Sequence, residues 1–168
     1  MKKSFWKFII IASVVTGVLQ NANGQNAKSD KEAAKALTIK HEIESGNFTF
    51  IARSVSPLRG LSRPLNAYYS MQVFKDSVIC YLPFIGRAYT APVTTAESGI
   101  DFTSTRLKYN VTQGRKNTWR ISIKPQDQFN TRELLLTVFT NGESSLQVTS
   151  NNRDPISFDG YIKNNTKE

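Results

Sequence analysis

Hydrophobic alternation is the feature that most constrains the fold of this 168-residue chain. From Gly46 almost to the end, apolar residues recur at every second position, in short runs separated by residues typical of turns. A period of two places alternate side chains on opposite faces of a strand. We therefore predict eight or nine strands, at residues 48–52, 68–74, 78–82, 100–103, 107–112, 119–123, 133–140 and 145–150, with 156–162 as the ninth.

Turn residues between these runs predict hairpins. Asn141 and Gly142 both tolerate the positive φ angles of a type I′ turn, and strongly apolar runs flank them. Residues 75–77 form a second turn, and residues 113–117 a looser one. Strands this short and this close together indicate a meandering antiparallel sheet. Closing that sheet into a barrel, or folding it into a sandwich, would hide its edges.

One helix is expected before the sheet, over residues 29–45. Ser29 and Asp30 are candidate N-caps, and Gly46 is suited to end the helix. The apolar face of this helix consists mostly of alanines. We therefore expect it to pack against something larger or to cover an opening.

The N-terminus has the layout of a secretory signal peptide. Lys2 and Lys3 precede an uncharged run at residues 8–19, and the small residues Ala22 and Gly24 follow. The alternative is a membrane anchor, but the run of 12 residues falls short of the roughly 20 that span a bilayer. We expect cleavage near Gly24 and export to the periplasm, the outer envelope or the medium.

Three segments follow from these patterns: a signal peptide at residues 1–24, a helix-containing segment at 25–45, and one barrel-like β domain at 46–163. The mature chain contains no other segment of spanning length, so we expect it to be soluble and to lack an integral membrane segment. Three of the nine net positive charges lie in the leader, and the others are scattered, with no run of Lys and Arg longer than two residues. Scattered charge and export argue against a nucleic-acid partner.

Motifs that announce chemistry are scarce. The chain has one cysteine and one histidine, and it contains neither a metal-ligating cluster nor a nucleophile motif, so we expect no cofactor, no metal and no catalytic residue. Cys80 alternates with Val78 and Leu82 and is therefore expected in the core. Paired carboxylates remain conceivable, but sequence spacing cannot bring two of them together.

The stretch at residues 55–66 interrupts the alternation. It contains two prolines and a glycine, and three arginines accompany it (Arg53, Arg59 and Arg63). We expect an irregular loop that forms a lid or rim. Arginines on such a loop could hold an anionic ligand, although most exposed arginines are simply solvated.

Aromatic residues are spread over most of the predicted strands. In a small barrel they either fill the interior or line a cavity, and the filled interior is the default. If a cavity exists, our candidates for lining it are Tyr69, Tyr81 and Trp119.

At residues 82–89, Leu-Pro-Phe-Ile-Gly-Arg-Ala-Tyr, the chain resembles a family known as domain of unknown function 4251, found in exported proteins of Bacteroides-type bacteria. Further motifs keep the same order through the rest of the chain, at residues 36–37, 45–48, 141–142, 146–150 and 156–160.

This resemblance implies a small β-barrel of lipocalin-like topology preceded by a helix, in agreement with the strand count. It implies no activity, and no catalytic residue is carried over. Pro83 should end its strand and Gly86 should allow a sharp turn, which would place Arg87 and Tyr89 near one rim. An ordered Arg87 there could hold a carboxylate or a phosphate.

Three functions are compatible with these patterns. The first is an envelope protein that binds a small apolar or amphipathic ligand in the barrel interior or mouth. The second is an interaction module that docks onto another envelope protein through an open sheet edge or an aromatic patch. An enzyme is the least supported.

Asp76-Ser77-Val78 also resembles the sequon at which such bacteria O-glycosylate exported proteins, although a plain β-turn explains the same residues. On the glycosylation hypothesis, the peptide that holds Ser77 carries an added sugar mass after export from the native host. Peptide mass spectrometry checks this, and an unmodified Ser77 peptide would contradict it.

Overall fold

A computed structural model describes residues 30–89 and 99–165 of the chain. The predicted signal peptide and the candidate cap Ser29 lie outside these residues. Residues 30–45 are helical, and nine strands follow. The strands are β1 (Phe48–Pro57), β2 (Arg63–Phe74), β3 (Ser77–Leu82), β4 (Ile100–Ser104), β5 (Leu107–Gln113), β6 (Trp119–Pro125), β7 (Thr131–Val138), β8 (Glu143–Ser150) and β9 (Ile156–Asn164).

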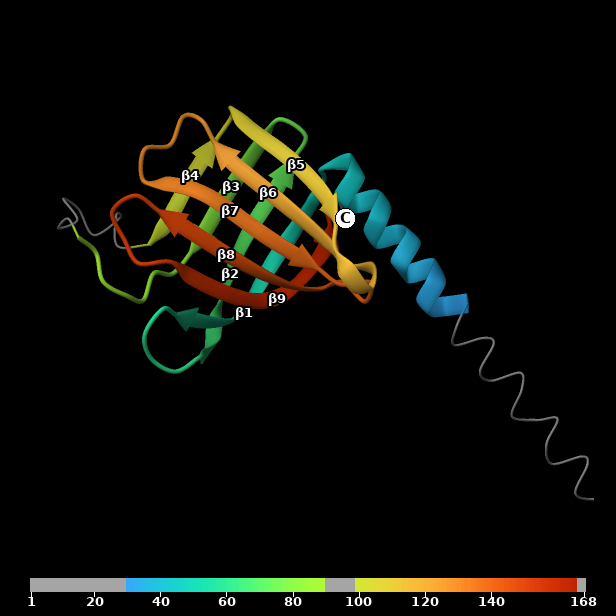
Figure 1. Cartoon of the computed structure of the whole chain (residues 1–168), viewed down its shortest axis with the longest axis horizontal. Coiled ribbons are helices and arrows are strands. Elements are labelled where there is room, and N and C mark those ends of the chain that lie inside the picture. Colours follow the sequence, from blue (N-terminus) through green and yellow to red (C-terminus); the bar gives the residue numbers. More distant parts are fainter. Residues whose placement is uncertain (1–29, 90–98, 166–168) are drawn as a thin grey trace, which may run out of the picture.

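The strands form one antiparallel sheet that curls into a nearly closed barrel (Figure 1). Their order is β4-β3-β2-β1-β9-β8-β7-β6-β5, so β1 pairs with β9 and the meander closes on itself. The prediction of a mainly β fold that closes into a small barrel after one helix is therefore confirmed. The sheet lacks one ladder, between β4 and β5.

The missing ladder has a simple origin. Going round the sheet from β4 to β5 crosses eight antiparallel pairings, an even number of reversals, so the two strands run in the same direction. Only Thr105 and Arg106 separate them. β4 and β5 thus behave as one strand that bends at these residues, its first part pairing with β3 and its second part with β6 (Figure 1).

The barrel interior is filled by the inward side chains of the alternating strands. Phe48, Phe50 and Phe158 have no exposed surface, and Cys80 is as deeply buried, between Val78 and Leu82 on β3. The core role expected for Cys80 is thus confirmed, and burial raises the pKa of its thiol well above its ordinary range. Aliphatic side chains from all nine strands except β5 complete the buried core: Val55, Met71, Val73, Val78, Leu82, Ile100, Ile121, Ile123, Leu134, Leu136, Val138, Leu146, Val148, Ile156 and Ile162.

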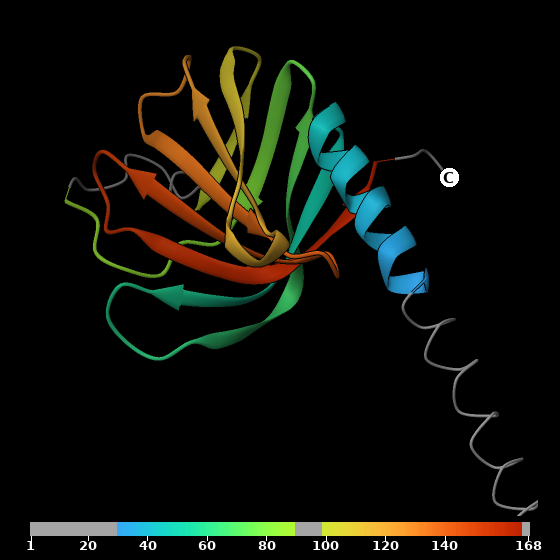
Figure 2. The ribbon, with the colours of Figure 1, turned by 45° about the vertical axis from the view of Figure 1, so that its right-hand side comes forward.

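The helix packs against one end of the barrel through its last turns (Figure 2). Ile39 and Ile43 are buried there, and the Tyr109 hydroxyl donates a hydrogen bond of 2.7 Å to the carbonyl of Ile43. Gly46, at φ 63°, ends the helix. Its amide donates a hydrogen bond to the carbonyl of Ile43, and the amide of Asn47 donates one to the carbonyl of Glu42. The first half of the helix, including Leu37, is exposed.

The prediction of an irregular loop over residues 55–66 is wrong. β1 continues to Pro57 because β9 pairs with it all the way, ending at the partners Pro57 and Ile156. β2 begins at Arg63, which lies opposite Val55. The two strands form a long hairpin, and only residues 58–62 connect them.

The hairpin at residues 141–142 exists, but its turn type was predicted wrongly. Gly142 has φ 84°, whereas Asn141 does not have a positive φ. The amide of Phe139 donates a hydrogen bond to the carbonyl of Glu143, and the amide of Gly142 donates one to the carbonyl of Phe139. This is the three-residue loop that ends in a left-handed glycine. The looser turn at 113–117 contains a short 3₁₀ helix, Arg115–Asn117.

Gly160 lies where β1 and β9 approach each other most closely. The β1 register shifts between Ala52 and Ser54, and Gly160 is the partner of Ala52 at this bulge. A Cβ atom on Gly160 would lie 1.9 Å from the carbonyl oxygen of Ile51. The position therefore requires glycine.

We expect Gly160→Ala to lower the free energy of unfolding by roughly 3 kcal/mol, because the strands must move apart to admit the methyl group. Urea unfolding measures the change. Ser157→Ala, at a half-buried position of the same strand, is the control and should stay within about 0.5 kcal/mol of the parent. Equal stability of the two variants would contradict the close approach.

Candidate functional site

Side chains bond part of the open edge of β4, at the place where a ninth ladder would close the sheet. Arg153 donates from Nη1 to the carbonyl of Gly99 at 2.7 Å, and Gln128 donates from Nε2 to the carbonyl of Thr103 at 2.9 Å. Beyond the strand, the Thr105 amide donates to Asp127 Oδ2 at 3.0 Å. Three side chains thus replace a neighbouring strand.

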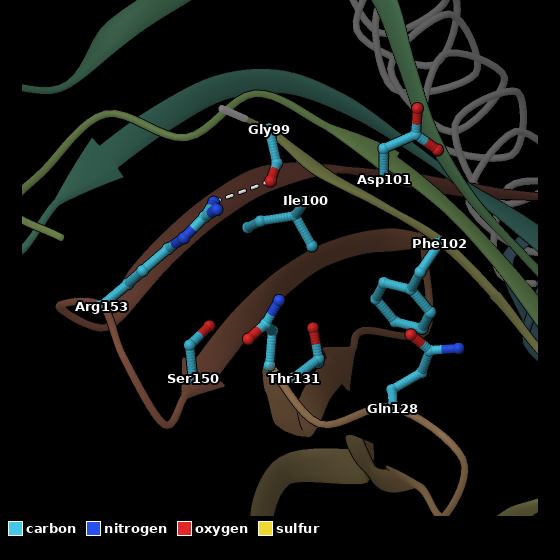
Figure 3. Close-up of a pocket in the computed structure, with 9 residues that line it drawn as sticks. Gly99, Ile100, Asp101, Phe102, Gln128, Thr131, Ser150 and Arg153 are labelled. Atoms are coloured by element: carbon cyan, nitrogen blue, oxygen red, sulfur yellow. Dashed lines mark hydrogen bonds between the residues drawn. The ribbon is translucent and has the colours of Figure 1, made fainter. Parts of the chain in front are cut away.

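Asp101 lies in the middle of this edge. Backbone groups of a strand alternate in direction, so the amide and carbonyl of Asp101 point the same way as those of Gly99 and Thr103. Among the hydrogen bonds between described residues, none outside the sheet ladders reaches these two groups. The Asp101 side chain is exposed and points away from the edge (Figure 3). Within the described residues, the edge therefore offers the amide and carbonyl of Asp101 and the outward amide of Thr103.

A cleft of about 220 Å³ opens beside this edge, at the barrel end opposite the helix. On one side lie Ile100 and Phe102 of β4, and facing them are the polar groups of Thr131 and Ser150 (Figure 3). Thr131 and Ser150 are cross-strand partners of β7 and β8, so the ladder sets their spacing. The complete lining is Gly99, Ile100, Asp101, Phe102, Gln128, Asn130, Thr131, Ser150 and Arg153.

Two loops carry the polar side of the cleft, and hydrogen bonds join them. The Asn151 amide donates to the carbonyl of Asn130 at 3.0 Å, and Asn151 Nδ2 donates to the carbonyl of Phe129 at 2.6 Å. Asn152 Nδ2 adds a bond of 3.3 Å to Asn130 Oδ1. The loop from β6 to β7 and the loop from β8 to β9 therefore form one connected wall.

Arg153 is the most deeply buried charged group of the cleft. Only 9% of its surface is exposed, and its guanidinium carbon lies 5.0 Å from the centroid of the Phe84 ring. Its backbone forms a β-bridge with Ala88. A cation over an aromatic face is stabilised electrostatically, so Phe84 and the Gly99 carbonyl together orient the guanidinium.

Arg87 and Tyr89, the residues predicted near one rim, do lie at this end. The Asp154 amide donates to the carbonyl of Arg87, and the Tyr89 amide donates to the carbonyl of Asn152. The Tyr89 hydroxyl donates to Asp154 Oδ1, and this hydrogen bond is the main cause that raises the pKa of Tyr89. The segment 87–89 therefore braces the loop that holds Arg153, while the Arg87 side chain itself is exposed.

The other predicted site residues lie elsewhere. Tyr69 and Tyr81 stack on each other, with ring centroids 5.5 Å apart, and Tyr81 is half exposed on β3. Trp119 begins β6 near the helix end and is buried in the core. None of these three lines the cleft. Ser77 is partly exposed at the first position of β3, next to the turn at residues 75–76.

Sequence reasoning missed the residues that do line the cleft. Gln128, Asn130, Thr131 and Ser150 are ordinary polar residues at strand ends, and no motif marks them. A usable signal exists, because alternate loops of a meander meet at the same barrel end. It would have grouped the ends of β6, β8 and β3 without showing which side chains converge.

The lining suggests binding more than bond cleavage. Asp101 is the one acid among the nine lining residues, so the cleft lacks the facing carboxylates used in glycoside hydrolysis. Within the described ranges, 30–89 and 99–165, no group of three or more His, Cys, Asp or Glu side chains could hold a metal ion. The same ranges contain no helix that is both long and apolar enough to cross a membrane.

A family model for a domain of unknown function, DUF4251, matches residues 30–162. The chain belongs to the DUF4251 family. The match covers the helix and almost every strand, including both walls of the cleft.

Among solved structures, the chain is similar to a DUF4251 family protein from Bacteroides eggerthii DSM 20697. The two share 12% sequence identity at a TM-score of 0.57, over 79% of this chain and 91% of that one. At this identity the likeness supports the DUF4251 fold alone. No curated protein matches this family member.

Asp127 gives a test of how the open edge is held. Besides the Thr105 amide it accepts a hydrogen bond from the buried Ser104 hydroxyl, and this bond is the main cause that lowers its pKa. A lowered pKa means that Asp127 stabilises the fold above the ordinary pKa of an aspartate, and that this stability is lost as the pH falls through its own pKa.

We therefore expect Asp127→Asn to lower the Tm at neutral pH, with the difference from the parent narrowing as the solution is acidified. Thermal unfolding followed by circular dichroism across a pH series measures both effects. Asp76→Asn, in the exposed turn between β2 and β3, is the control and should follow the parent throughout. A difference that widens on acidification would contradict the assignment.

Proposed function

We propose that this DUF4251 protein is a non-enzymatic binding protein of the cell envelope that holds a small amphipathic ligand in the cleft at the barrel mouth. The observation that carries the proposal is the open edge of β4, beside which polar groups converge opposite an apolar wall. Such a combination of an apolar surface and a few placed polar groups is typical of small-molecule sites.

The barrel interior is filled with side chains, which favours ligand binding at the barrel mouth. Phenylalanine and aliphatic side chains without exposed surface occupy the space that a ligand would need inside the barrel. The cleft volume of about 220 Å³ is below the roughly 300–1,000 Å³ of sites for drug-sized molecules. The ligand is therefore small, or only one end of it is enclosed.

The cleft also indicates the ligand chemistry. Ile100 and Phe102 offer an apolar surface, whereas the hydroxyls of Thr131 and Ser150 and the backbone of Asp101 offer hydrogen bonds. A ligand with one apolar face and several hydroxyl, amide or carbonyl groups satisfies both sides. The proposal thus keeps the amphipathic ligand and gives up a wholly apolar one.

Docking of another protein through the sheet edge has less support. Gln128 and Arg153 already bond the carbonyls on either side of Asp101, so an added strand could not use these two acceptors. Strand addition needs a run of unpaired backbone groups. Side chains blunt this edge in the way that natural sheets discourage such pairing.

The proposal is tested by purifying the protein from its native host and analysing it by native and denaturing mass spectrometry. We expect a stoichiometric small molecule in the parent. Ser150→Tyr, which fills the cleft, should lose it or bind it at least about tenfold more weakly. Ser145→Tyr, at a half-buried serine of the same strand outside the cleft, should retain it.

Two outcomes would overturn the proposal. One is a parent protein that carries no small molecule. The other is a ligand that Ser150→Tyr retains as well as Ser145→Tyr does, since the ligand would then lie elsewhere.

A further inference from the structure

The tip of the β1–β2 hairpin exposes two leucines to solvent. Leu58 is 58% exposed and Leu61 is 83% exposed, and both lie in the five-residue connection 58–62. Gly60, at φ 118°, allows the chain to turn between them. The hairpin stands away from the other strands in both views (Figures 1 and 2). Two large aliphatic side chains on such a projection are not covered by this chain.

The same hairpin is purely basic. From Phe48 to Lys75 the sequence contains no Asp or Glu. The exposed Arg59 lies between the two leucines, and the exposed Arg63 lies two residues after Leu61. A solvated mixed-charge surface would carry both signs. Here apolar and cationic side chains alternate over the sequence Leu58-Arg59-Gly60-Leu61-Ser62-Arg63.

A third arginine, Arg87, extends this basic surface. Arg59 and Arg87 both act electrostatically on the Tyr89 phenol, so the hairpin tip and the segment 87–89 are neighbours. The nearest acid at Tyr89 is Asp154, which is buried and accepts the phenol hydrogen bond. Its carboxylate is therefore largely shielded from solvent.

We propose that this tip, residues 58–63, docks onto an anionic lipid surface. The two leucines enter the boundary between headgroups and acyl chains, and Arg59 and Arg63 pair with lipid phosphates. Peripheral proteins bind membranes through this combination of buried apolar area and cationic attraction. Tyr68, exposed further along β2, is of the amphipathic type that occurs at headgroup level.

A protein partner is the weaker alternative. A stable protein interface buries roughly 800 Å² on each side, usually around aromatic anchors. The tip offers two leucines on a narrow turn, without a flat or concave surface around them. A lipid surface deforms around such a projection and does not need shape complementarity.

Sedimentation with vesicles tests the proposal directly. The chain from Gln25 onward is used, since it contains every described element and lacks the apolar leader. We expect binding to vesicles of phosphatidylglycerol mixed with phosphatidylcholine, weaker binding in high salt, and little binding to phosphatidylcholine alone. The same binding to both vesicle types would overturn the proposal.

Paired variants separate the two contributions. Leu58→Ser with Leu61→Ser should weaken binding at least about tenfold, because the inserted apolar area is lost. Arg59→Gln and Arg63→Gln should each cost roughly fivefold. Leu37→Ser, at a leucine 68% exposed on the helix at the other end of the barrel, is the matched control and should bind like the parent.

A fluorescent reporter distinguishes insertion from simple attraction. The emission of Leu61→Trp should shift to the blue with phosphatidylglycerol vesicles, whereas that of Leu37→Trp should not, and the buried Trp119 gives the same background in both. An unshifted Leu61→Trp, or a leucine pair whose loss leaves binding unchanged, would overturn insertion. Binding of polyglutamate in preference to the vesicles would reassign the tip to an acidic protein partner.

Discussion

The joint between β4 and β5 is the constraint on which the barrel depends. Antiparallel order forces the two strands to run in the same direction, so they cannot pair as the other neighbours do. The barrel closes instead through a bend at Thr105 and Arg106, where the amide of Gln126 donates to the Arg106 carbonyl and Asp127 binds Ser104 and Thr105. The cleft lies beside the edge of β4 that no second strand covers. The bend that closes the barrel therefore also creates the candidate site.

The alternation in sequence predicted all nine strands because burial on one face imposes the same period on every strand. It failed where pairing overrides local signals. Pro57 and Pro64 are residues that usually interrupt strands. Pairing with β9 nevertheless continues β1 as far as Pro57. Pro64 lies opposite Ser54, at the irregular end of the β1–β2 ladder. The turn type at Asn141 was predicted wrongly because asparagine tolerates a positive φ but does not require one.

Most residues that line the candidate site could not be predicted from the sequence, because no local pattern marks them. Arg87 and Tyr89 were placed at a rim because Pro83 and Gly86 carry local conformational information. Thr131 and Ser150 carry none, and they meet because β7 and β8 still pair beyond a register shift between Thr131 and Glu133. Convergence of side chains from separate loops depends on the shear of the whole barrel, which no local pattern encodes.

The pairing of β1 with β9 has a consequence for how the chain reaches its fold. It joins the first strand to the last, and a side-chain bond between Thr49 and Asn165 links positions 116 residues apart. Proteins rich in contacts between residues distant in sequence fold more slowly than those with local contacts, so we expect slow closure of this barrel. Until the last strand has been synthesised, β1 has only β2 as a neighbour, so the barrel cannot close while the chain is still being made.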